Sequence, residues 1–390
     1  MPFNSFQLKE LASIQTGPFG SQLHKEDYCE IGTPIVTVEH LGQKNFSTQN
    51  LPKVSNNDVE RLKKYLLKPG DIVFSRVGSV DRCSYVSTNF DKWLFSGRCL
   101  RIRVTDERIN SEYLYYYFCQ NNIKEYVRSV AVGATMPSIN TKIMGETPIR
   151  LPSRKNQDLI VNILSSLDEK IEINDRIIKS IENLSISLVS HAINISKSEK
   201  SVQLSEYALL NPNRKLSKDH VARYIGMSSL STSISTPEDW EFKSYKGGVK
   251  FKNGDTLVAR ITPCLENNKG AFINILEEDE IAFGSTEYIV ISSKGDLPNE
   301  FFYCLSKTKE FRDYAIKHLN GTSGRQRVSA DDLAAFCLPI FSPKAKNLMQ
   351  NYLPSLFTSI ANLSRQNKLL TTMRNTLLPK LLSGEIELTN

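Results

Sequence analysis

Hydrophobic residues recur at alternating four- and three-residue steps in two long segments of the chain. This spacing is typical of a helix that packs one seam against a partner helix. The first seam runs from Ile160 to Leu188 and the second from Met349 to Leu381. The central seam positions are Leu164, Leu167, Ile171, Asn174 and Ile178, then Leu356, Ile360, Leu363, Asn367 and Leu370. One asparagine lies in each seam, where a polar residue fixes register at some cost in stability.

Two arrangements of these helices fit the pattern. They could pack on separate cores, or they could pair with each other, which is the sharper interpretation. The first segment has balanced charge and the second is basic until Glu385, so a modest attraction between them is expected. Pro354 lacks a backbone donor and clashes with the preceding turn, so we expect the second helix to begin or kink there.

Outside the helices the chain repeats itself at about half its length. LKPGDIVFSRV around Gly70 is echoed by FKNGDTLVARI around Gly254, and NSEYLYYYF from Asn110 is echoed by LPNEFFYCL from Leu297. Each glycine precedes a short apolar strand, as a turn residue does. We interpret the aromatic run as core packing, because the second copy repeats it in a helical context. The chain is therefore two copies of one α+β unit, each closed by a long helix.

Composition excludes few classes of protein. The chain has 390 residues, of which 40% are hydrophobic and 23% charged, as in ordinary globular proteins. Its net charge of +7 permits nucleic-acid binding without requiring it. No apolar run is long enough for a transmembrane helix, and the first residues lack a signal-peptide pattern. No membrane association and a cytoplasmic location are therefore expected.

Catalytic motifs are missing from the sequence. No P-loop, GxGxxG or GxSxG pattern occurs, and the histidines form no HxH or HExxH pattern, so we expect no metal site. Glu241 and Lys243 in PEDWEFK resemble the end of a nuclease metal site, which keeps a metal-dependent nuclease as one alternative. A protein-binding scaffold without DNA specificity is the other alternative.

Polar residues recur at matching places in the two copies. GATMPSINTK follows the aromatic segment in the first copy, and GTSGRQRVS follows it in the second. Arginine pairs with guanine, and glutamine or asparagine with adenine. Small polar turns also cap helices, as Ser329 to Asp332 could, and the two roles are compatible. The candidate DNA-binding residues are Ser21, Lys25, Arg76, Thr135, Ser138, Asn140, Lys142, Arg260, Ser323, Arg325, Gln326 and Arg327.

Six motifs, duplicated and in this order, resemble the specificity (S) subunits of type I restriction-modification systems nearly end to end. They are KPGDIVFSR, NSEYLYYYF, MPSINTK, ILSSLDEKIEIN, GTSGRQRVS and LLPKLLSGEI. The resemblance implies an α+β fold with two tandem α/β target-recognition domains related by a pseudo-two-fold. Two long helices in an antiparallel coiled coil would separate these domains. The implied parts are domain 1 at 1–152, a central helix at 153–200, domain 2 at 201–341 and a C-terminal helix at 342–390.

The same resemblance implies a function. Each domain would read one half of a split, asymmetric site in double-stranded DNA, and the helices would dock two methyltransferase (M) subunits, joined by restriction (R) subunits. The chain itself would be non-catalytic and hold no cofactor, because S-adenosylmethionine, ATP and Mg²⁺ would belong to the partner subunits. A seam of roughly 42 Å, at ~1.5 Å per residue, would act as a ruler that sets the half-sites about one turn of DNA apart.

Overall fold

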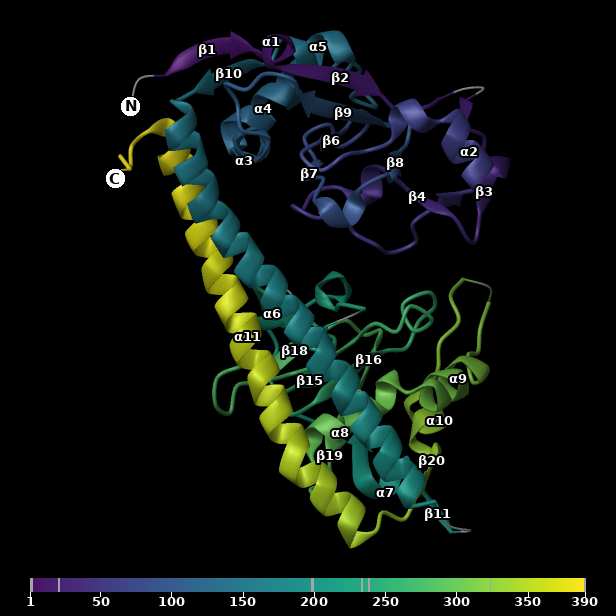
Figure 1. Cartoon of the computed structure of the whole chain (residues 1–390). Helices are drawn as coiled ribbons and strands as arrows, with labels where there is room; N and C mark the ends of the chain where they lie inside the picture. Colours follow the sequence, from purple (N-terminus) through teal and green to yellow (C-terminus); the bar gives the residue numbers. More distant parts are fainter. Residues whose placement is uncertain are drawn as a thin grey trace. The chain divides into compact units, whose positions relative to one another are not determined.

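The computed structural model describes residues 3–19, 22–197, 200–232, 234–237, 239–322 and 324–388. The chain forms two compact units. Unit 1 comprises Met1–Glu169 with Leu370–Asn390, and unit 2 comprises Lys170–Leu369. Two long helices, α6 (Arg154–Ile195) and α11 (Pro343–Ser383), contribute to both units (Figure 1). Each begins one residue after the boundary predicted for it, and the division of the chain into four parts stays a prediction.

Unit 1 contains two four-stranded sheets and a two-stranded ribbon among its described residues, with strand orders β2-β9-β6-β7, β3-β5-β4-β8 and β1-β10. The strands are β1 (Asn4–Gln7), β2 (Ala12–Thr16), β3 (Tyr28–Cys29), β4 (Thr33–Val36), β5 (Lys53–Val54), β6 (Ile72–Ser75), β7 (Cys83–Tyr85), β8 (Leu94–Phe95), β9 (Cys99–Val104) and β10 (Pro148–Leu151). The helices are α1 (Leu8–Leu11), α2 (Asn56–Arg61), α3 (Ser111–Cys119), α4 (Asn121–Val130) and α5 (Thr141–Gly145).

Unit 2 repeats this plan, with strand orders β12-β19-β16-β17, β14-β13-β18-β15 and β11-β20 in its described part. The strands are β11 (Ser201–Gln203), β12 (Ala208–Leu210), β13 (Val221–Ile225), β14 (Glu241–Ser244), β15 (Val249–Phe251), β16 (Thr256–Ala259), β17 (Gly270–Phe272), β18 (Ala282–Gly284), β19 (Tyr288–Ser293) and β20 (Cys337–Pro339). The helices are α7 (Leu204–Tyr207), α8 (Asn299–Lys307), α9 (Lys309–Lys317) and α10 (Ala330–Ala334).

The two units match element by element. The antiparallel ribbon of β1 and β10 corresponds to that of β11 and β20, and the parallel pair of β4 and β8 corresponds to that of β13 and β18. Strands β6 and β16 are buried along their whole length at the centre of matching sheets. The predicted duplication of an α+β unit is therefore confirmed.

The repeated glycines and aromatic residues have the roles predicted for them. Gly70 and Gly254 have φ angles of 91° and 88°, a left-handed conformation that glycine adopts without strain. The aromatic side chains of α3 and α8 are buried in the cores of their units rather than offered to a ligand. These helices cover one face of the sheet in each unit and connect it to the long helices.

Helices α6 and α11 lie side by side in antiparallel orientation (Figure 1). In unit 1, Ile160 and Leu164 of α6 share a core with Leu378 and Leu381 of α11. In unit 2, Asn174 of α6 contacts Asn367 of α11. Farther along, Ser196, just after α6, accepts the N–H of Ser342, just before α11. Residue numbers therefore rise along one helix as they fall along the other. The interpretation that the two helices pair with each other is confirmed.

Pro354 lies inside α11, which is one helix from Pro343 to Ser383. The prediction that this helix begins at Pro354 is wrong. Pro354 lies on the exposed face, as does Gln350, whose carbonyl would have received the missing N–H. Water can hydrate that carbonyl, so the lost hydrogen bond costs less than it would in a buried turn. The carbonyl of Pro354 accepts the Thr358 hydroxyl at 2.8 Å.

Candidate DNA interface and helix pair

One predicted loop of unit 1 is tied to the end of strand β6. Val132 and Ser138 exchange two backbone hydrogen bonds of 2.9 and 2.8 Å, which close the loop. The Ile139 N–H donates to the carbonyl of Arg76 at 2.9 Å, which fixes the loop to the sheet. Residues 133–136 at the tip are exposed. The loop is therefore held at its base and presents its tip to solvent.

Unit 2 holds a counterpart loop in the same way. Asn320 and Arg327 exchange backbone hydrogen bonds of 3.0 and 2.9 Å, and the Val328 N–H donates to the carbonyl of Arg260 at 3.0 Å. Arg325, near the tip of the loop, is exposed. Both copies thus use the residue that follows the central strand, Arg76 or Arg260, as the backbone anchor of a polar loop.

The predicted residues of the first loop have different surroundings. Thr135 and Lys142 are exposed. The Ser138 hydroxyl donates to the carbonyl of Val132 at 3.2 Å, and the Asn140 side chain accepts the Ile143 N–H at 2.8 Å as the N-cap of α5. Ser138 and Asn140 therefore stabilise local structure, whereas Thr135 and Lys142 present their side chains to solvent.

The second loop carries more charge. Arg325 is exposed and Gln326 is half-buried, whereas Ser323 lies outside the described residues. Arg327 donates from Nε and Nη2 to the carboxylate of Glu287, at 2.9 and 2.7 Å. These hydrogen bonds lower the pKa of Glu287. Arg327 therefore neutralises a carboxylate beside the loop.

Two of the remaining predicted residues donate hydrogen bonds to backbone carbonyls, and the other two lie wholly or partly outside the described part of the chain. Arg76 donates to the carbonyl of Gly97 at 3.0 Å, and Arg260 donates to the carbonyl of Val328 at 3.1 Å. Both side chains are half-buried and join separate backbone segments, a role that the sequence did not indicate. Ser21 and the side chain of Lys25 lie outside the described residues.

The strand that contains Glu241 and Lys243 forms a cluster of aromatic and charged residues. The two side chains form an ion pair on β14, and the Lys243 Nζ lies 4.3 Å from the centre of the Tyr224 ring. Arg223 lies over the rings of Trp240 and Phe242, at 5.1 and 5.7 Å. Within the described ranges no three His, Cys, Asp or Glu side chains are grouped to hold a metal ion. The alternation of polar and aromatic residues in the strand was the signal for this cluster, which sequence reasoning missed.

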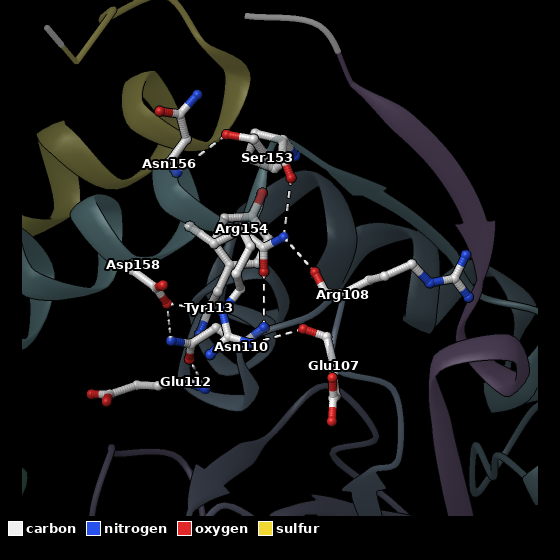
Figure 2. A network of polar contacts seen from close by, with 11 residues as sticks. Glu107, Arg108, Asn110, Glu112, Tyr113, Ser153, Arg154, Asn156 and Asp158 are labelled. Carbon is white, nitrogen blue, oxygen red and sulfur yellow. Dashed lines mark hydrogen bonds and ion pairs between the residues drawn. The ribbon is translucent and has the colours of Figure 1, made fainter.

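A polar network anchors the start of α6 to unit 1 (Figure 2). The Asn110 side chain donates to Asp158 at 2.7 Å, and its backbone N–H donates to the buried Gln157 at 2.8 Å. Arg154 donates to Asp158 at 3.0 Å and to the carbonyl of Glu107 at 2.8 Å. The first turn of the long helix is thus fixed to the segment that precedes α3.

The ten predicted seam positions of α6 and α11 are all buried or half-buried. The two seam asparagines meet within unit 2, where Asn174 donates to the Asn367 side chain at 2.7 Å. Asn367 in turn donates to Asp175 at 2.7 Å, and Asn174 donates to Gln366 at 2.8 Å. A polar cluster therefore interrupts the apolar seam. Neither long helix, nor any other helix in the described part of the chain, is long and apolar enough to cross a membrane.

Known proteins of one kind match this chain. The family model described as "Type I restriction modification DNA specificity domain" matches residues 2–183. The putative type I restriction enzyme MjaX specificity subunit of Methanocaldococcus jannaschii is 23% identical over 98% of this chain and 93% of its own length. The HindI specificity subunit of Haemophilus influenzae is 21% identical over 86% of this chain and 90% of its own length. The EcoAI specificity subunit of Escherichia coli is 32% identical over 131 residues, which are 32% of this chain and 22% of that protein.

A solved structure has the same fold. The S subunit of a type I restriction-modification system from M. genitalium aligns over 97% of this chain and 96% of its own length, with a TM-score of 0.59 and 15% sequence identity. It shares the two α/β domains and the packed pair of long helices. The family model, the near full-length relatives and this common architecture agree. The chain therefore belongs to the DNA specificity (S) subunits of type I restriction-modification systems.

Proposed function

We propose that this S subunit reads a bipartite, asymmetric DNA site, with one half-site for each recognition domain, and docks two methyltransferase subunits through α6 and α11. As a specificity subunit it is the non-catalytic component of its complex. S-adenosylmethionine, ATP and Mg²⁺ then serve the partner subunits, restriction subunits complete the assembly, and the complex works in the cytoplasm. The duplicated unit with its paired polar loops carries this proposal, because two similar but different surfaces suit two different half-sites.

The two loops support different half-sites. The tip of the first loop exposes Thr135 beside Met136, which is 57% exposed, whereas the second exposes Arg325. Arginine forms two hydrogen bonds with the major-groove edge of guanine, whereas the methyl of threonine and apolar side chains contact the methyl of thymine. We therefore expect a guanine in the half-site read by the second domain. We expect recognition of the first half-site to depend more on apolar contact.

The part of helix α6 that belongs to unit 2 exposes an apolar surface that a partner protein could bind. Ile173, Ile177 and Leu184 are 42%, 40% and 56% exposed, and their spacing places them along one side of the helix. An exposed apolar stripe of this kind is typical of a protein interface. This stripe is the surface of α6 that we assign to a methyltransferase subunit.

Sequencing of methylated bases in host DNA, with and without this gene, tests the proposal. We expect a split methyladenine motif that disappears on deletion and returns with a plasmid copy of the gene. The Arg325→Ala variant should relax the motif at one guanine of the second half-site and leave the first half-site unchanged. An unchanged methylome, in a host that expresses the neighbouring methyltransferase, would contradict DNA specificity and favour a protein scaffold.

The length of the helices sets the distance between half-sites in this proposal. An insertion of four residues near Ser180 of α6 lengthens the helix by about 6 Å, and DNA rises about 3.4 Å per base pair. We expect the methylated motif to gain spacer length while both half-sites keep their sequences. The same insertion in the exposed turn at Gly247 is the control. A spacer that stays unchanged after the helix insertion would refute the ruler.

A further inference from the structure

A charged joint connects the recognition domain of unit 1 to both long helices. Asp168 of α6 accepts the hydroxyl of Tyr116 from α3 at 2.7 Å and the guanidinium of Arg374 from α11 at 2.7 Å. The Asp168 side chain is 9% exposed, and Tyr116 is buried. Burial and the nearby carboxylate raise the pKa of Tyr116, so its hydroxyl keeps its proton and donates. One carboxylate thus links three helices.

The joint continues into the sheet region of the domain. Lys44 donates to the Tyr116 hydroxyl at 3.2 Å and forms an ion pair with Glu112 at 2.5 Å. The carbonyl of Lys44 accepts the N–H of Tyr85 at the end of β7 at 2.8 Å. A continuous chain of polar contacts therefore runs from the central sheet through Tyr116 and Asp168 to α11.

Unit 2 has an aromatic contact at the position on α11 that matches Asp168. The start and end of the matching helices α3 and α8 align Tyr303 with Tyr115, next to Tyr116, and the repeat of the long helices aligns Phe357 with Asp168 and Ser185 with Arg374. The rings of Tyr303 and Phe357 lie 5.8 Å apart, and Phe357 is 5.0 Å from the ring of Phe272. The Ser185 hydroxyl donates to the carbonyl of Ile181 in its own helix at 2.8 Å. At this position aromatic packing takes the place of the carboxylate and its two donors, while another buried carboxylate of α6, Glu182, accepts the N–H of Ser235.

The two kinds of joint differ in how sharply they define an angle. Hydrogen bonds to a charged group are short, strong and directional, and they weaken steeply when their geometry changes. Aromatic contacts accept a range of tilts and offsets at similar energy. The Asp168 joint therefore holds the angle between its domain and the helix pair more narrowly than the Phe357 joint does.

We propose that Asp168 is a positioning residue that sets the angle of the first recognition domain on the helix pair and thereby limits the spacer lengths at which the first half-site is read. This inference rests on the proposed function, since it assumes that both domains bind one DNA duplex. It assigns spacer selectivity to the joint as well as to helix length.

The test measures binding of the S subunit, assembled with its methyltransferase, to duplexes that contain both half-sites with the native spacer or with one or two base pairs more or fewer. The variants are Asp168→Asn, which keeps the shape and removes the charge, and Glu169→Gln at an exposed neighbouring position as the control. Wild type should prefer its own spacer by about tenfold or more over a spacer changed by one base pair. Asp168→Asn should reduce this preference to about threefold, because the domain tilts more freely. The base preference within each half-site should stay unchanged.

A second variant separates positioning from folding. Asp168→Phe combined with Arg374→Ser transplants the joint of unit 2, so it should regain most of the melting temperature that Asp168→Asn loses while its spacer preference stays broad. Equal loss of affinity at every spacer, or wild-type spacer preference in both variants, would overturn the proposal. Wild type is measured first: failure to bind any of the duplexes would refute the proposed function and this inference with it, whereas selective binding supports the function whatever the variants do.

Discussion

The two units bury the same aspartate and neutralise it differently. Asp71 and Asp255 follow the repeated glycines, and each is 1% exposed. Each accepts a backbone N–H at 2.8 Å, from Lys68 or from Lys252. In unit 1, Arg103 of β9 donates to both oxygens of Asp71 from two nitrogens, at 2.6 Å each. In unit 2, the matching position on β19 is a serine.

Unit 2 obtains its guanidinium from elsewhere in the chain. Arg214, in the segment before β13, donates one nitrogen to both oxygens of Asp255 at 2.7 and 2.6 Å, and the Ser292 hydroxyl donates to the same carboxylate. Burial raises the pKa of Asp255 in spite of these donors. The comparison shows that the duplication kept the buried acceptor, while its donor moved from strand to loop. A buried carboxylate requires a hydrogen-bond donor, but that donor can come from any part of the sequence that reaches it.

Removal of the arginine that pairs with the buried aspartate should show the largest difference in stability between the two units. Arg103→Met leaves Asp71 with its backbone N–H as the remaining donor described here, and we expect a loss of about 3 kcal/mol in the free energy of unfolding. Arg214→Met leaves Asp255 with the Ser292 hydroxyl as well, so we expect a loss of about 2 kcal/mol. Denaturant unfolding of each variant gives these values.

The matched control is Arg108→Met, which removes an arginine that is 57% exposed and paired with Asp106 at the surface. It should leave the free energy of unfolding nearly unchanged, because solvent screens an exposed ion pair. An equal loss for all three variants would show that burial of the acceptor does not decide the cost.

A buried lysine gives the stability of unit 2 a dependence on pH. Lys307 donates to the carbonyl of Asn268 at 2.6 Å, and burial lowers its pKa to about 8, whereas the last residue of the matching helix in unit 1 is Cys119. The unfolded chain binds more protons than the folded chain between this pKa and the ordinary lysine value. The free energy of unfolding should therefore rise with pH, by about 2 kcal/mol from pH 8 to pH 10.

Lys307→Gln removes the amine that titrates and should remove this rise. The readout is the difference between wild type and variant in denaturant unfolding at each pH, because tyrosines that titrate in both proteins then cancel. Parallel pH profiles would mean that Lys307 does not titrate in this range.

An exchange of donor positions should have a smaller effect. Ser292→Arg combined with Arg214→Ser moves the guanidinium of unit 2 to the strand position that unit 1 uses. We expect the double variant to retain the free energy of unfolding to within about 1 kcal/mol, while Arg214→Ser alone loses more. A double variant no more stable than that single one would show that the strand position in unit 2 cannot reach Asp255.

The smallest expected effect concerns the polar loop of unit 2. Glu287→Gln removes the charge that pairs with Arg327, which is 41% exposed. We expect a loss of about 0.5 kcal/mol at pH 7. Because Arg327 lowers the pKa of Glu287, its stabilising effect is present above the ordinary glutamate pKa and is lost as the pH falls through the folded-state value. The difference between variant and wild type should therefore vanish in acid, as thermal unfolding can show.

Local patterns in the sequence were enough to predict the duplication, the helix pair and the aromatic cores. The 4-3 spacing and the repeated glycines determine local backbone conformation, so they can be interpreted without knowledge of the tertiary structure. The partners of buried charges were not predictable in this way. Arg214 reaches Asp255 across 41 residues, and no spacing rule distinguishes it from a surface arginine. Asn140 caps a helix, and its contact with DNA stays a prediction, because the same side chain type suits both roles.

The asparagine pair in the seam should have constrained which substitutions this chain accepted during evolution. Asn174 is fully buried and donates to Asn367, so a mutation to leucine at one position leaves the other amide without that partner, at a cost of about 1–3 kcal/mol. A lineage could cross this barrier most easily by exchanging both residues within a short interval. Close relatives should therefore carry two polar residues or two apolar residues at these positions, and seldom one of each.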